Sequence, residues 1–202
     1  MGRGQVGIAN SLNLGHRENR RQQAGFTLTE LLVAMVLAGV AMAAIYAAYV
    51  TQQRAYKTTQ DVTAIQQNLR AGMYFLEKDL RMAGYDPEES GDFGFDVMGP
   101  QAFRYYWDAD EDGVKDPDEY VAYKFESPEP TLERDRGDGS FNDIASDISN
   151  VTFYYYTSDS SPSGVTAINA ADIRSVLVYM TAERGGHSRT MSSRIWCRNT
   201  GL

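Results

Sequence analysis

The sequence predicts an α+β protein in which one long N-terminal helix, from about residue 26 to residue 83, packs on a C-terminal antiparallel β-sheet. Three observations support this prediction. Residues 31–53 are uncharged and mostly apolar, apolar residues then recur with helical spacing as far as Ala83, and beyond Gly84 the pattern becomes strand-like. The 202 residues leave room for one domain with a core and one long accessory element.

The apolar stretch 26–53 has the length of a membrane span, because about 20 apolar helical residues cross a bilayer core. The apolar part of a signal peptide is shorter, at about 7–15 residues. By the positive-inside rule, the basic residues ahead of this stretch keep the N-terminus in the cytoplasm; they are Arg3, Arg17, Arg20 and Arg21. We therefore expect a cytoplasmic leader (1–25), a transmembrane half-helix (26–53) and an extracytoplasmic domain (54–202).

The second half of the helix is amphipathic. Apolar residues follow one another at steps of three and four, as expected for a helix with one buried face; they are Val62, Ile65, Leu69, Met73, Leu76, Leu80 and Ala83. No proline interrupts the pattern before Pro87, and Gly84 provides a C-terminal stop. This half of the helix is therefore built to pack against a sheet.

Five segments beyond Gly84 have strand character and are separated by turn residues. They are 103–107, 120–126, 151–157, 173–181 and 191–197. We expect residues 158–171 and 183–188 to form hairpin connections. The single cysteine, Cys197, excludes an internal disulfide and is predicted to be a small core residue on the last strand.

The charge distribution argues against a nucleic-acid partner. The net charge is −8, and removal of residues 1–25, which contain four arginines and one glutamate, would lower it by three to −11. Between Asp86 and Asp143 there are 18 acidic and 5 basic residues. Such a surface repels phosphate backbones and attracts cations or basic partners.

The junction ahead of the apolar stretch reads Gly25-Phe26-Thr27-Leu28-Thr29-Glu30-Leu31-Leu32-Val33. It resembles the cleavage and methylation motif of type IV prepilins. The resemblance implies a pilin-like fold, cleavage by prepilin peptidase between Gly25 and Phe26, N-methylation of Phe26, and a glutamate fifth in the mature chain.

Physical chemistry supports these residue types at the junction. Glycine leaves the backbone unobstructed for a protease, and a carboxylate at the edge of an apolar span is costly unless it is paired. Cleavage would create a positive amine on Phe26. We expect Glu30 of one subunit to neutralise the Phe26 amine of a neighbour and so to set their register.

The rest of the chain resembles W-type minor pilins and the related J-type minor pseudopilins more loosely, at residues 75–85, 132–134, 138–139 and 198–199. This resemblance implies a minor subunit that primes or caps a type IV pilus, with a type II secretion pseudopilus as the alternative. It implies a single-pass inner-membrane protein with a periplasmic body that later enters a filament. Its partners would be prepilin peptidase, other major and minor pilins and the inner-membrane assembly platform.

The acidic segment 108–119 fits the twelve-residue calcium-loop template. Oxygen ligands fall at positions 1, 3, 5, 7, 9 and 12, with glycine at position 6; the ligands are Asp108, Asp110, Asp112, the Val114 carbonyl, Asp116 and Glu119. The flanking sequence is strand-like, whereas the template has helices. The interpretations are a calcium site, favoured by the mutual repulsion of the carboxylates, and a solvated acidic hairpin tip.

Nothing in the sequence indicates an enzyme. The two histidines, His16 and His187, lie in the leader and in a Gly-rich turn, which leaves little for a histidine-dependent hydrolase. Two further hypotheses are a secreted calcium-binding or enzymatic domain cut near Ala47 and a permanently anchored receptor domain. Neither needs Glu30 or the Gly25–Phe26 junction.

Overall fold

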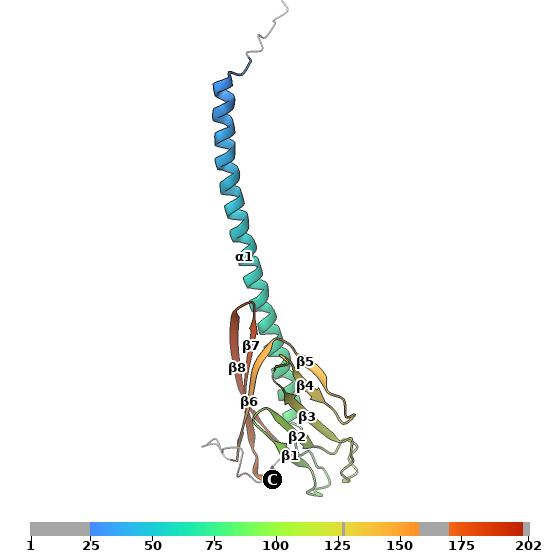
Figure 1. Cartoon of the computed structure of the whole chain (residues 1–202). Helices are drawn as coiled ribbons and strands as arrows, with labels where there is room; N and C mark the ends of the chain where they lie inside the picture. Colours follow the sequence, from blue (N-terminus) through green and yellow to red (C-terminus); the bar gives the residue numbers. More distant parts are fainter. Residues whose placement is uncertain (1–24, 127, 158–169, 200–202) are drawn as a thin grey trace, which may run out of the picture. The chain divides into compact units, whose positions relative to one another are not determined.

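The computed structural model of the protein describes residues 25–126, 128–157 and 170–199. Within these ranges, one helix, α1 (Leu28–Leu80), is followed by eight strands and a short 3₁₀ helix, η1 (Ala170–Asp172) (Figure 1). An antiparallel sheet has the order β1–β2–β3–β4–β5, and a second has the order β6–β7–β8. The strands are β1 (Gly94–Met98), β2 (Ala102–Tyr106), β3 (Tyr120–Phe125), β4 (Leu132–Asp135), β5 (Asn142–Ala145), β6 (Ile148–Tyr156), β7 (Ser175–Arg184) and β8 (His187–Trp196).

The predicted α+β class is confirmed, while the expectation of one sheet is wrong. Five of the strands, β2, β3, β6, β7 and β8, match the predicted segments, with ends shifted by up to four residues. The other three strands were missed: β1, β4 and β5 are four or five residues long, and pairing in β1 and β5 is interrupted by register shifts. The predicted 158–171 connection falls largely outside the described residues, and the 183–188 connection shortens to Gly185–Gly186.

Local hydrogen bonds explain both ends of α1. The Thr27 hydroxyl accepts from the Glu30 amide at 3.3 Å, so Thr27 caps the helix and the first helical residue is Leu28. At the other end, the Met82 and Ala83 amides donate to the carbonyls three residues earlier. This tighter turn ends the α-helix at Leu80, three residues before the predicted end.

The chain divides into two units between Tyr49 and Val50. In the second unit, Val50–Leu202, here called the body, one face of α1 is buried as the spacing predicts. Its buried apolar side chains are Ile65, Leu69, Met73, Leu76 and Leu80. Val62 is only partly buried, and the buried face also includes the acidic residues Asp61 and Asp79.

Aromatic and helical contacts join the two sheets into one core. The Phe103 ring of β2 meets the Phe153 ring of β6 edge to face, with centroids 4.9 Å apart. The Tyr155 hydroxyl of β6 donates to the Gly99 carbonyl at 2.9 Å. A Cβ at Gly72 of α1 would lie 3.0 Å from the Met180 side chain of β7, so glycine permits the close approach of helix and sheet there.

Within the body, two ionic contacts join α1 to residues of the sheets. Near its C-terminal end, Asp79 accepts from Arg134 of β4 at 2.6 Å. Nearer its middle, Asp61 pairs with Arg184 at 3.2 Å, and Arg184 also pairs with Asp147 at 3.1 Å. Gly185 has a positive φ of 58°, and a Cβ there would collide with the Asp61 carboxylate. This turn therefore requires glycine.

Candidate processing junction and acidic loop

The candidate cleavage junction lies on exposed, non-helical backbone. Gly25 and Phe26 precede the first helical residue, and 83% of the Phe26 surface is exposed. A Cβ at Gly25 would meet no atom within 4 Å. Glu30 lies in the first turn of α1, where its negative charge also complements the positive end of the helix dipole. Glu30 therefore lies four residues beyond Phe26, inside the helix that Phe26 precedes.

The segment of α1 that follows is apolar, and no described residue covers it. α1 is the one described helix that is long and apolar enough to cross a membrane, and no residue of its apolar stretch is buried. Large apolar side chains project from it all round; they include Leu31, Leu32, Val33, Met35, Val36, Leu37, Val40, Met42 and Ile45. Such a surface requires lipid or other apolar helices around it.

The acidic loop connects β2 to β3 and is folded around Asp108, which is fully buried. The Asp108 carboxylate accepts from the Asp112 amide at 3.2 Å and from the Gly113 amide at 3.0 Å. Gly113 has a φ of 72°, the left-handed conformation that glycine adopts readily. Carboxylate oxygens of Asp108, Asp110 and Asp112 all lie within 4.8 Å of one another. That spacing suits calcium, whose oxygen ligands lie about 2.3–2.6 Å from the ion.

The remaining predicted ligands are arranged differently. Asp116 and Glu119 are not part of this group of three carboxylates. The Glu119 carboxylate accepts from the Ala109 amide at 2.6 Å and from the Asp116 amide at 3.1 Å, which closes the loop at its base. Val114 donates its amide to Asp112, and its side chain is exposed.

The electrostatics of the loop favour a cation. Burial and then the charges of Asp112 and Glu119 raise the pKa of both Asp110 and Asp116. Ionisation of these two carboxyls is therefore opposed by partial loss of solvent and by the neighbouring negative charges. A bound divalent cation would reverse that effect.

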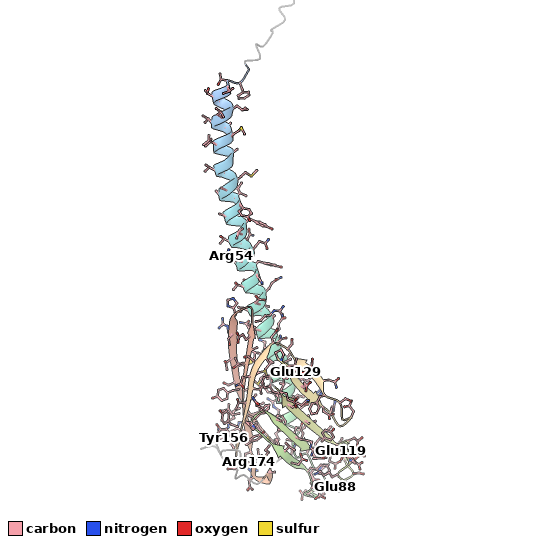
Figure 2. All side chains as sticks on the ribbon, in the orientation of Figure 1. Arg54, Glu88, Glu119, Glu129, Tyr156 and Arg174 are labelled. Carbon is pink, nitrogen blue, oxygen red and sulfur yellow. The ribbon has the colours of Figure 1, made fainter. Side chains whose placement is uncertain are left out.

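A second segment, residues 85–91, supports the loop and was not anticipated from the sequence. The Tyr85 hydroxyl donates to Glu111 at 2.9 Å, and the Asp108 amide donates to the Tyr85 carbonyl at 2.8 Å. Glu88 packs next to Gly113, and Glu88 and Glu119 lie at the same end of the body (Figure 2). The sequence contains no local signal for this contact, because Tyr85 lies 26 residues from Glu111.

Comparison with known families identifies the chain. A junction of this type ahead of one long helix, with antiparallel sheets behind it, defines a type IV pilin-like protein. Residues 20–46 match the prokaryotic N-terminal methylation motif, and residues 58–194 match the model of prepilin peptidase-dependent protein B. Since the second match covers more than half of the chain, the protein belongs to the prepilin peptidase-dependent protein B family. No curated protein and no solved structure matches the chain.

Family membership has direct consequences for this chain. It implies processing by prepilin peptidase and pilin-type partners, and pilin-like proteins are structural rather than enzymatic. The apolar helix and the methylation motif are consistent with an anchor in the inner membrane.

Proposed function

We propose that this protein is a minor pilin that primes or caps the assembly of a type IV pilus. It is inserted in the inner membrane with its N-terminus in the cytoplasm and its body in the periplasm. Prepilin peptidase cuts after Gly25, Phe26 is methylated, and the assembly platform transfers the subunit into a filament with other major and minor pilins. The observation that supports this most strongly is the Gly25–Phe26 junction on exposed backbone directly ahead of an uncovered apolar helix.

The mature N-terminus tests this proposal. We expect the membrane-extracted protein to begin at Phe26, with one added methyl group, as measured by intact mass and terminal peptide sequencing. Gly25→Val should leave the leader attached, because a branched side chain obstructs the extended backbone at the cut.

Gly39→Ala is the matched control, since a Cβ at Gly39 meets nothing within 4 Å. This variant should be processed normally. A wild-type chain that begins near Thr51 would instead establish a secreted domain, and an uncut chain a permanently anchored receptor. A subunit absent from sheared pili, but required for type II secretion, would identify the pseudopilus alternative.

We further propose that the 108–119 loop binds calcium outside the cytoplasm. Asp108, Asp110 and Asp112 would provide the first ligands, and the Val114 carbonyl, Asp116 and Glu119 would complete the shell. The convergence of the first three carboxylates supports this assignment. Binding would require rotation of Glu119 away from its two backbone donors or sharing of its oxygens with them.

Calcium is expected to raise the melting temperature of the detergent-solubilised full chain, because a ligand that binds only the folded state stabilises it. Trp107 lies next to Asp108 in sequence and reports on binding by fluorescence. Asp110→Asn should weaken binding at least tenfold, whereas Asp118→Asn, at a position that the template does not use, should have little effect. Equal losses of calcium affinity in both variants would indicate a nonspecific acidic surface.

Calcium binding should also weaken as the pH falls through the raised pKa values of Asp110 and Asp116, because the protonated carboxyls no longer attract the ion.

A further inference from the structure

β8 is a long, regular strand at the edge of the three-stranded sheet. It has ten residues, and no described strand pairs with its outer side. Its register with β7 runs without a shift from the Arg184–His187 pair to the Ser175–Trp196 pair. The opposite edge strand, β6, has a register shift and donates from Ile148 and Phe153 to backbone carbonyls of other segments. Because long regular edges are normally shortened, bulged or covered, β8 is exceptional in this fold.

The backbone groups that β8 presents at its edge follow from the hairpin geometry. Both turn residues, Gly185 and Gly186, have positive φ, as in a two-residue hairpin whose flanking pair is hydrogen-bonded. Hydrogen-bonded and non-hydrogen-bonded pairs then alternate along the strands. The hydrogen bond from the Cys197 amide to the Arg174 carbonyl, at 2.9 Å, fits this alternation. The residues whose amides and carbonyls point away from β7 therefore include Ser188, Thr190, Ser192 and Trp196, and all four of these residues are exposed.

The outward face of the three-stranded sheet, which ends at this edge, has the side-chain composition of a protein interface. On the outward face of the sheet, the Tyr154 and Tyr179 rings meet edge to face, with centroids 5.8 Å apart. Arg194 lies over the exposed Trp196 ring at 4.8 Å. Tyrosine, tryptophan and arginine are the residues that contribute most to binding at protein interfaces.

The charge of this edge indicates the chemistry of its partner. Residues 185–199 contain Arg189, Arg194, Arg198 and His187 and no acidic residue, in a chain whose net charge is −8. A basic strand would be repelled here, whereas carboxylates on an incoming strand would face arginines.

We propose that β8 binds an extended acidic segment of a partner protein, which adds to the sheet as a fourth strand. Main-chain hydrogen bonds at Ser188, Thr190 and Ser192 would hold the segment, and Arg189 and Arg194 would select its charge. This inference goes beyond filament assembly, because it concerns the body and does not depend on cleavage at Gly25.

Photo-crosslinking of the full chain in its native host tests the proposal. Benzoylphenylalanine is placed at Thr190 and, in a separate variant, at Ser192, and the crosslinked peptides are mapped by mass spectrometry. We expect both positions to crosslink to one acidic segment, at sites about two residues apart, because paired strands advance in step. A second copy of this chain, crosslinked within its acidic region 86–143, would support the docking. Absence of crosslinks, or crosslinks to segments without net negative charge, would overturn it.

Two pairs of variants make the test specific to the edge. Ser192→Pro removes one outward amide without affecting pairing with β7, and the crosslink from position 190 should fall at least tenfold, whereas Ser192→Ala should retain it. Arg189→Glu should cause a similar loss that Arg189→Lys does not. If the Ser192→Pro and Arg189→Glu variants both crosslinked from position 190 as efficiently as the wild type, strand addition would be contradicted. The N-terminus of the crosslinked protein, read in the same samples, reports separately on processing at Gly25.

Discussion

Asp79→Ala is expected to destabilise the body by about 3–5 kcal/mol, the usual cost of removing one partner from a buried ion pair. Asp79 is 6% exposed and accepts from Arg134 at 2.6 and 3.0 Å and from the Tyr123 hydroxyl at 2.5 Å. Burial of Tyr123, together with the Asp79 charge, raises the pKa of its hydroxyl, which remains a donor at neutral pH. The alanine variant would leave both donors partly or fully buried without this acceptor.

Denaturant unfolding of the detergent-solubilised full chain measures this effect, with Trp107 and Trp196 as fluorescent reporters in the body. Asp96→Ala is the matched control, because the Asp96–Arg104 pair is partly exposed and should contribute only about 0–1 kcal/mol. The double variant Asp79→Ala with Arg134→Met should be more stable than Asp79→Ala alone, since it removes the unpaired charge. Equal losses for Asp79→Ala and Asp96→Ala would show that burial does not strengthen the contact.

This contact shows where prediction from sequence ends. The spacing of Ile65, Leu69 and Leu76 predicts the buried helical face, because it depends only on residues three or four apart. The same spacing of apolar residues predicts that Asp79, as a charged residue, lies on the solvent-exposed side of the helix. Its partners lie 44 and 55 residues further along the chain, so nothing local marks it as buried.

The missed strands have a related physical cause. β4 reads LERD, and its two central residues, Glu133 and Arg134, find ionic partners on β3 and α1. Charged residues in a short segment indicate a loop unless such partners are known. The position of the acidic loop between two strands was predictable from consecutive residues, whereas its support from Tyr85 was not. Calcium binding by this loop stays a prediction.

Glu30→Gln is expected to remove the subunit from filaments while its cleavage after Gly25 continues. Residues 31–53 carry no charge, so within packed apolar helices the Glu30 carboxylate would find no other formal charge along this span of the helix. In the proposed filament, the Phe26 amine of a neighbouring processed subunit would supply the opposite charge, and the attraction would be strong where water is excluded. Glutamine has nearly the same shape as glutamate but no charge. We therefore expect the amount of the Glu30→Gln subunit in sheared filaments to fall at least tenfold.

Immunoblots of sheared and membrane fractions measure this loss, and the N-terminal residue is read from the membrane fraction. Glu30→Asp is the matched control: it keeps the charge and the favourable position at the helix N-terminus, and should restore part of the assembly. If Glu30 acted only through the helix dipole, Glu30→Gln would cost a fraction of a kcal/mol, about 0.3–1, and would leave assembly nearly unchanged. That outcome would rule out the charge pair between Glu30 and the Phe26 amine of a neighbour. It would not affect the proposed cleavage after Gly25.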